Sequence, residues 1–210
     1  MHTGSCAVLD LRDSDPGVIV VDAQKAFASR DGSLADAGTE VSAAVETVPA
    51  IRELLARVRK AGLPVFFTRS VRHPDGRDAP GRNVSVVPEI YRDREPICLR
   101  GTPDVEYVDG LEPEPDEYEV TKQRYDAFEG SNLERWLRTE AVGTVLLCGF
   151  MTNGCVEATA RSAYERRFNV VLADDCAASI TERAHRAAVE NVDMLLGAAA
   201  ESDVIRLPGE

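Results

Sequence analysis

The sequence has little positive charge and no long apolar run, and both absences exclude classes of function. The 24 Lys and Arg residues are outnumbered by 36 Asp and Glu residues, so the formal net charge is −12. This charge argues against nucleic acid or an anionic membrane as a partner, because both bind basic surfaces. No run reaches the roughly 18 apolar residues that a membrane span needs. An anionic substrate therefore requires positive charge gathered locally at its binding site.

Residues typical of metal sites and serine hydrolases are also scarce. The three histidines, His2, His73 and His185, match no zinc or iron spacing. The five cysteines include no Cys-x-x-Cys pair, and the chain has no Gly-x-Ser-x-Gly motif. An odd number of cysteines, several in apolar segments, indicates reduced intracellular thiols. The polar N-terminus lacks the pattern of a secretory signal, so we expect a cytoplasmic protein.

The length predicts one domain with a substantial core, since 210 residues with 44% hydrophobic content are ample for that. We expect a loose N-terminal leader over residues 1–16 and a single domain over residues 17–210. Residues 73–116 contain seven of the eleven prolines. A segment this long and irregular is usually functional or wraps a neighbour.

Short apolar strands alternate with helical segments along the chain. The expected strands cover residues 18–21, 65–68, 117–121, 144–149, 170–173 and 204–207. The expected helices cover residues 41–61, 131–140, 156–164 and 181–196. Pro49 falls inside the first helical pattern, where it is compatible with the start of a second helix. This alternation predicts an α/β fold with a mainly parallel sheet.

One stretch, residues 144–160, joins a buried strand to a helix through a tight turn that contains Gly154 and Cys155. This arrangement puts Cys155 at the first turn of the helix, where unpaired N–H groups and the positive end of the dipole meet. Such an environment favours the thiolate, which is the nucleophilic form of cysteine. The alternative is a small buried residue at a tight crossover.

Asp22 and Lys122 stand at the ends of two other strands, and parallel strands end at the same edge of a sheet. The two residues can therefore converge with Cys155. A thiolate attacks a carbonyl carbon, a nearby ammonium stabilises it, and a carboxylate can carry the proton. The alternative is a buried Asp–Lys ion pair that closes the sheet edge, with Cys155 as a bystander.

Three motifs in this order resemble the isochorismatase-like cysteine hydrolases. They are VVDAQKAF at 20–27, TKQRYDAF at 121–128 and GFMTNGCV at 149–156, and AGLPV at 61–65 also fits. The resemblance runs from about Val18 to Ile205. It implies a three-layer α/β/α fold with a mainly parallel, six-stranded, Rossmann-like sheet.

The resemblance also implies site residues. Asp22, Lys122 and Cys155 correspond to the catalytic triad of the family, which works through a covalent acyl-enzyme. The backbone N–H groups of Met151 and Cys155 correspond to the oxyanion hole. Family members carry a non-proline cis peptide that aims these donors, and it falls at Phe150–Met151 here.

Departures from the family pattern narrow the subgroup. Nicotinamidases carry a metal-binding Asp-x-His after the second strand, whereas residues 68–73 read TRSVRH here, so we expect no metal and no cofactor. Isochorismatases that cleave a vinyl ether lack the cysteine, so Cys155 favours carbon–nitrogen hydrolysis. The 122–128 stretch is similar to that of the ureidoacrylate, biuret and N-carbamoylsarcosine amidohydrolases.

Side chains beside the motif residues are candidates for substrate contacts. They are Gln24, Phe27, Arg69, Arg72, Tyr125 and Phe128. Gln24 and Phe27 follow the proposed catalytic Asp, and the two later aromatic residues can form an apolar wall. Arg69 or Arg72 can bind a substrate carboxylate, which supplies the local positive charge. The alternative for both arginines is a solvated loop position.

Together these features predict a cytoplasmic cysteine-dependent amidohydrolase that acts on a small amide or ureido compound and forms a homodimer or homotetramer. Nucleic acid and membranes are not expected partners. Three alternatives stay open at this stage. They are a vinyl-ether hydrolase of the isochorismatase type, a hydrolase of a lactam or other secondary-metabolite amide, and a non-catalytic binding protein with the same fold.

Overall fold

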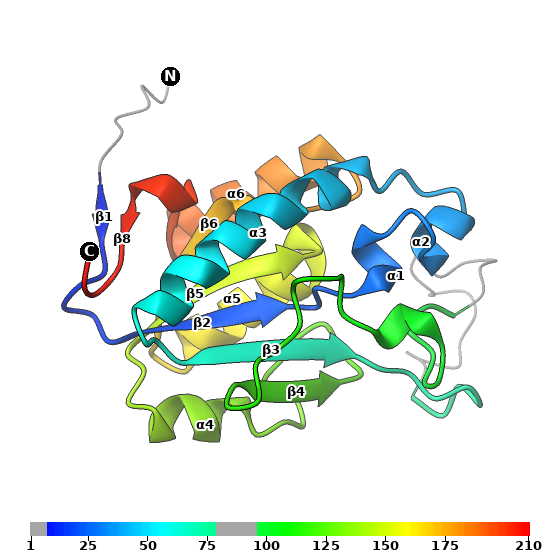
Figure 1. Cartoon of the computed structure of the whole chain (residues 1–210), viewed down its shortest axis with the longest axis horizontal. Coiled ribbons are helices and arrows are strands. Elements are labelled where there is room, and N and C mark those ends of the chain that lie inside the picture. The colour runs from blue at the N-terminus through cyan, green and yellow to red at the C-terminus, as the bar shows by residue number, and fades with distance from the viewer. Residues whose placement is uncertain (1–7, 79–95) are drawn as a thin grey trace.

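A computed structural model describes residues 8–78 and 96–210. Its centre is a six-stranded sheet in the order β4-β3-β2-β5-β6-β7, and every neighbouring pair is parallel (Figure 1). The strands are β2 (Pro16–Val21), β3 (Val65–Ser70), β4 (Tyr118–Lys122), β5 (Thr144–Phe150), β6 (Asn169–Ala178) and β7 (Gly197–Ala200). Val18–Val21 is buried on both faces, as the continuous apolar run predicts for a central parallel strand.

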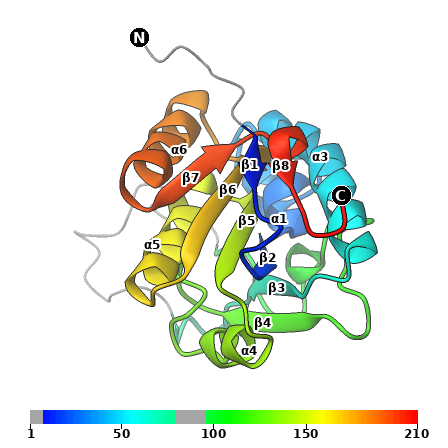
Figure 2. The same cartoon turned by 90° about the vertical axis from the view of Figure 1, so that its left-hand side faces the viewer.

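Helices cover both faces of the sheet and give three layers (Figure 2). One face packs against α3 (Ser42–Lys60), and the other packs against α4 (Leu133–Thr139), α5 (Glu157–Glu165) and α6 (Glu182–Leu195). Two short helices, α1 (Lys25–Ala28) and α2 (Ser33–Asp36), follow β2. The three-layer α/β/α expectation is therefore confirmed. No helix among residues 8–78 and 96–210 combines the length and apolarity needed to cross a membrane.

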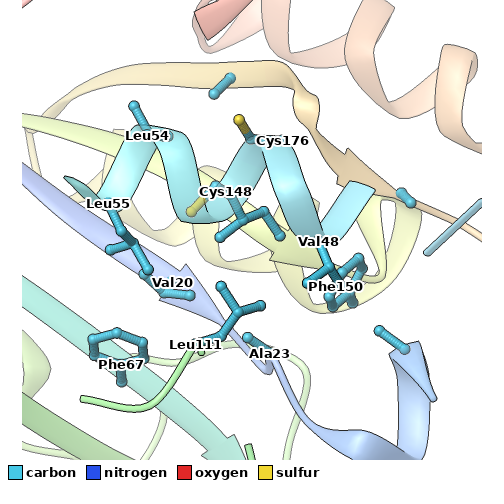
Figure 3. Close-up of a cluster of buried hydrophobic side chains, with 14 of the residues drawn as sticks. Val20, Ala23, Val48, Leu54, Leu55, Phe67, Leu111, Cys148, Phe150 and Cys176 are labelled. Carbon is cyan, nitrogen blue, oxygen red and sulfur yellow. The ribbon is translucent and has the colours of Figure 1, made fainter. Parts of the chain in front are cut away.

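The core on the α3 side is made of apolar residues at helical spacing that meet alternate residues of the strands. Figure 3 shows Val48, Leu54 and Leu55 of α3 together with Val20 of β2 and Cys148 of β5. α3 is one continuous helix, and its exposed Pro49 lies within it rather than at the start of a second helix.

The sixth strand is not the one that the sequence pattern indicates. Residues Ile205–Arg206 form β8, which pairs with β1 (Leu9–Asp10) in a separate two-stranded sheet. The edge position of the main sheet belongs to β7, a Gly-Ala-Ala-Ala segment. A Cβ atom at Gly197 would lie 1.9 Å from the Val170 carbonyl oxygen, so glycine is what lets β7 approach β6.

Part of the expected leader is ordered, because β1 lies within residues 1–16 and Leu11 is buried. Residues 1–7 lie outside the described chain. In its described part, the irregular segment 73–116 forms the short helix η3 (Pro103–Val105) and takes part in the bridges Gln24–Tyr107 and Arg72–Leu99. Residues 79–95 of that segment also lie outside the described chain.

Gly149 brings the ends of the two central strands together. Its φ is +110°, and a Cβ atom there would lie 2.1 Å from the Val21 carbonyl oxygen. Only glycine fits such a close approach with a positive φ. The residue after β2 and the turn after β5 are thereby held side by side.

Candidate active site

The polar residues of the three sequence motifs meet at the carboxyl edge of the sheet. Asp22 follows β2, Lys122 ends β4, and Cys155 lies in η4 (Thr152–Val156), the turn after β5. Because the strands are parallel, their carboxyl ends point toward the same edge (Figure 1). Side chains that are far apart in the sequence thereby come into contact.

Lys122 links the other two residues. Its buried ammonium donates to Asp22 Oδ2 at 2.6 Å, to the Arg124 carbonyl at 3.0 Å and to Cys155 Sγ at 3.2 Å. These three bonds use every proton that the ammonium carries. Burial alone lowers the pKa of Lys122, but its interactions with the Asp22 carboxylate and the Cys155 sulfur outweigh burial and raise it. Lys122 is therefore held as a cation between a carboxylate and a thiol.

Asp22 is fully buried and held by backbone and side-chain bonds. Its φ is +48°, in the left-handed region that Asp adopts more readily than most residues. The Thr68 hydroxyl donates to Asp22 Oδ1 at 2.6 Å and accepts from the Asp22 N–H at 3.1 Å. Since Lys122 occupies the other oxygen, each carboxylate oxygen of Asp22 has a partner.

The protonation state of Cys155 differs from the expectation. Burial raises the pKa of the Cys155 thiol to about 12; Lys122 acts to lower this pKa and Asp22 to raise it. The expectation that a helix N-terminus favours the thiolate is therefore wrong here. The cost of burying an anion exceeds what the neighbouring cation returns. Cys155 is a thiol that needs a base to become a nucleophile.

The turn between β5 and α5 has the backbone that the resemblance implies. The Phe150–Met151 peptide bond is cis, and η4 forms a single π-helical turn. Met151 directly precedes this turn and Cys155 lies within it. N–H groups in the first turn of a helix lack intrahelical acceptors, so this segment can present backbone donors to a bound oxygen atom.

A cavity of about 190 Å³ opens beside Cys155. Three of the expected substrate contacts, Phe27, Arg72 and Tyr125, line it together with Met151 and Cys155. Other described lining residues are Ser70, Ile97, Gln123, Arg124, Asn153, Gly154 and Ile180. The cavity therefore combines apolar side chains, two arginines and the Cys155 thiol in its lining.

The structure places the other three expected contacts away from the described cavity lining. Gln24 is buried, and its amide exchanges two bonds with the Ser70 backbone, at 3.0 and 2.7 Å. Arg69 forms an ion pair with Glu119 at 2.6 Å. Phe128 is buried in the core on the α4 and α5 side. Gln24 thus supports a lining residue, and the other two take part in packing and surface pairing.

Several lining or supporting residues were not anticipated from the sequence. A sequence signal was available for two of them. Thr68 ends the expected strand 65–68, and Arg124 lies two residues after Lys122 in the same motif. Ile97 and Ile180 come from irregular segments without periodicity, so no pattern pointed to them. Asn153 lies inside the GFMTNGCV motif, but its residue type alone does not indicate a contact with the cavity.

The last question about the site is whether it contains a group of metal ligands. Within residues 8–78 and 96–210, no group of three or more His, Cys, Asp or Glu side chains is arranged to hold a metal ion. The His73 N–H donates to Asp78 Oδ2 at 2.9 Å, which closes a local turn.

Comparison with known proteins assigns the chain to a family. The model of the isochorismatase domain matches residues 16–203, which is most of the chain. The chain belongs to the isochorismatase family.

Individual relatives refine this assignment. The ureidoacrylate amidohydrolase RutB of Methylobacterium radiotolerans is 35% identical over 191 residues, covering 86% of this chain and 74% of that protein. The crystal structure of an isochorismatase family protein from Desulfovibrio vulgaris has a TM-score of 0.79 at 26% identity, covering 91% of this chain and 96% of that one.

A cysteine hydrolase from Pseudomonas syringae pv. phaseolicola has a TM-score of 0.77 at 28% identity, covering 90% of this chain and 89% of that one. Within its family, the present chain is an amidohydrolase, a hydrolase of carbon–nitrogen bonds other than peptide bonds.

Proposed function

We propose that this protein hydrolyses a carbon–nitrogen bond of a small ureido or carbamoyl acid through a thioester-type intermediate on Cys155. The observation that carries the proposal is the position of Lys122, whose ammonium contacts both Asp22 and Cys155 at the end of the cavity. A buried acid–base pair in contact with a cysteine beside a cavity has the parts that covalent amide hydrolysis needs.

In the first half of the reaction, Asp22 takes the Cys155 proton as the sulfur attacks the substrate carbonyl carbon. The carbonyl oxygen becomes an oxyanion that accepts hydrogen bonds from the N–H groups of Met151 and Cys155. The tetrahedral intermediate collapses when Asp22 returns the proton to the departing nitrogen. The nitrogen leaves as ammonia or an amine, and the acyl group stays on sulfur.

The second half regenerates the enzyme. A water molecule attacks the acyl carbon while Asp22 takes one of its protons. The carbon–sulfur bond then breaks, and Asp22 returns the proton to the sulfur. Lys122 stabilises the sulfur anion in both halves, since its charge lowers the Cys155 pKa toward the working range. No oxidant or cofactor is needed for this cycle.

The substrate class is inferred from the cavity and from the relatives. A volume of about 190 Å³ suits a small molecule, and the relative from M. radiotolerans is named for ureidoacrylate, a ureido acid. Arg72 and Arg124 line the cavity of a chain whose formal net charge is −12. We assign binding of the substrate carboxylate to Arg72. Its positive charge offsets the repulsion of an anion by the negative net charge of the protein.

Ammonia release tests this proposal. Wild type, Cys155→Ala and Cys148→Ala are assayed against a panel of small amides, ureido acids and a vinyl-ether substrate. We expect wild type and Cys148→Ala to release ammonia from ureido acids, and Cys155→Ala to release none. Ammonia release by Cys155→Ala, or turnover of the vinyl ether alone, contradicts the proposal.

We further propose that the protein assembles as a cytoplasmic homodimer or homotetramer. Exposed Tyr164, Met194 and Leu195 on α5 and α6 support an interface there, because large apolar side chains are costly to leave in water. Sedimentation equilibrium gives the oligomeric state, and a monomer at micromolar concentration contradicts this part.

A further inference from the structure

The turn after the cis peptide is anchored by side chains that do not line the active-site cavity. Thr152 Oγ1 lies 2.9 Å from Nδ1 of His185, which belongs to α6. Ser179, directly after β6, donates from its hydroxyl to Asn153 Oδ1 at 2.5 Å. Two consecutive residues that follow Met151 are thus fixed from one side of the molecule, where α6 lies beside α5 (Figure 2).

His185 is itself fixed by a hydrogen-bond chain. Its Nε2 lies 2.8 Å from Asp174 Oδ1, and Arg186 Nη1 lies 3.1 Å from the other oxygen of Asp174. The hydrogen bond from His185 is the main cause that lowers the pKa of Asp174, with Arg186 adding to it. Asp174 is therefore an ionised acceptor, and Nε2 of His185 carries the proton.

This arrangement leaves one ring nitrogen of His185 for the turn. Because Nε2 is bonded to Asp174, the Thr152 hydroxyl pairs with Nδ1. Thr152 has no exposed surface and His185 has 8%. A buried hydroxyl without its partner is costly, so the pair holds Thr152 in one orientation.

We propose that His185 is a positioning residue for the amidohydrolase reaction, acting through Thr152 on the oxyanion-binding turn. Thr152 directly follows Met151 and begins the turn that contains Cys155, so its position sets where the two N–H donors point. Asp174 orients His185, in the way that a carboxylate orients an imidazole that does not itself touch substrate. The inference rests on the proposed function, because it assigns the oxyanion role to this turn.

The position of the two N–H donors matters most in the transition state. Oxyanion donors act on charge that develops after substrate binds, so a misplaced donor lowers kcat and leaves KM nearly unchanged. Thiol chemistry that needs no oxyanion, such as alkylation of Cys155 by iodoacetamide, is set by Lys122 and Asp22 instead. A structural role alone predicts lower stability without this separation of rates.

Four variants test the inference: Thr152→Val, Thr152→Ser, His185→Ala and the double variant Thr152→Val/His185→Ala. Thr152→Val and His185→Ala are expected to lower kcat by about 10- to 100-fold, with KM and the alkylation rate within about threefold of wild type. Thr152→Ser keeps the hydroxyl and is expected to stay within about threefold of wild type in kcat. The double variant should be no slower than the slower single variant, because both changes break one chain.

Two further proteins separate positioning from folding. Thr144→Val removes an equally buried hydroxyl at the opposite end of β5, where it is bonded to Asn169, and it should leave kcat unchanged. Asp174→Asn is a milder change that replaces Thr152→Val in the test if that variant does not fold. It is expected to lower kcat by about three- to tenfold. An unchanged kcat, a change confined to KM, or additive effects in the double variant overturns the inference.

Acylation by p-nitrophenyl acetate distinguishes this inference from the proposed function. The reaction needs Cys155 and an oxyanion site but no ureido acid. If wild type is acylated and acylation of Thr152→Val is slower by about tenfold or more, the positioning role of His185 is supported. This result does not depend on hydrolysis of a ureido acid. A wild type that is not acylated, or a Thr152→Val variant that acylates at the wild-type rate, contradicts the inference directly.

Discussion

Cys148 and Cys155 belong to one strand–turn unit, and the comparison between them separates burial from reactivity. Cys148 lies inside β5 in the core below α3 (Figure 3), with its sulfur 3.9 Å from the Ile19 carbonyl oxygen. Cys155 lies past the strand end, 3.2 Å from the Lys122 ammonium and at the wall of a cavity. Burial raises the pKa of both thiols.

The difference between the two cysteines therefore lies in their neighbours. Cys148 has no charged side chain in hydrogen-bonding contact among the described residues, whereas Cys155 touches a cation that is paired with a carboxylate. A raised pKa is compatible with a nucleophile only where a base can take the proton. In the proposed mechanism Asp22 is that base, and the Lys122 ammonium beside it stabilises the thiolate that the transfer forms.

The largest expected difference is between the alanine variants of the two cysteines. Cys155→Ala should lower turnover by at least about 10⁴-fold, since it removes the nucleophile. Cys148→Ala should keep turnover and lower the free energy of unfolding by about 1 kcal/mol, because it leaves a small cavity. Steady-state kinetics and urea unfolding measure both, and comparable losses of turnover in the two variants would break the distinction.

Asp22→Asn should separate turnover from thiol reactivity. Turnover should fall by about 10²- to 10⁴-fold because the base is gone, while iodoacetamide should alkylate Cys155 faster because Asp22 raises its pKa. In wild type the alkylation rate should keep rising above pH 9, since the thiol pKa is about 12. The variant should shift this profile to lower pH. A parallel loss of both activities would mean that Asp22 only maintains the fold.

The raised pKa of Cys155 also makes the free energy of unfolding depend on pH. Folding raises the Cys155 pKa, so the folded state favours the thiol. The contribution to stability is complete below the ordinary thiol pKa of about 8.5 and is lost as the pH rises through about 12.

Lys122→Met compares a buried ion pair with a surface one. Removal of Lys122 leaves a buried carboxylate without its cation, and we expect a loss of about 3–5 kcal/mol in the free energy of unfolding. Lys25→Met is the matched control, since Lys25 pairs with Glu106 at the surface and should lose less than about 1 kcal/mol. The double variant Asp22→Asn/Lys122→Met should recover part of the loss. Equal losses for the two lysines contradict this ranking.

Arg72→Gln and Arg69→Gln have the smallest expected effects. Arg72 lines the cavity, so its loss should raise KM for ureido acids by about 10- to 100-fold, as expected for one charge-assisted bond. Arg69 pairs with Glu119, so its loss should leave KM unchanged. Neutral amides of the same size should not distinguish the two variants. A larger KM effect at Arg69 would reassign the carboxylate.

Sequence reasoning brought Asp22, Lys122 and Cys155 together because each stands at or just past the end of an expected strand, and parallel strands end at one edge. It misjudged the sixth strand because Gly-Ala-Ala-Ala has neither alternation nor β-branched residues, whereas residues 204–207 include the β-branched Val204 and Ile205. Tertiary packing against β6 decides that position, and local propensity does not.

The substrate contacts were predicted less well for a similar reason. Arg69 and Arg72 look equivalent in the sequence. In the structure Arg69 lies within β3, whereas Arg72 follows β3 and forms a β-bridge with Leu99. The Cys155 pKa depends on the balance of burial against nearby charge, and no sequence pattern contains that balance. The hydrogen-bond chain from Asp174 to Thr152 joins distant elements and has no local signature either.

Trapping with hydroxylamine tests the covalent mechanism most directly. An acyl group on Cys155 can pass to hydroxylamine in place of water, so trapping does not require the intermediate to accumulate. With a ureido acid that releases ammonia, the account predicts an N-hydroxyurea product that increases with hydroxylamine concentration in wild type and Cys148→Ala. Steady turnover without any trapped product, or the same trapped product from Cys155→Ala, would contradict an acyl-enzyme on Cys155.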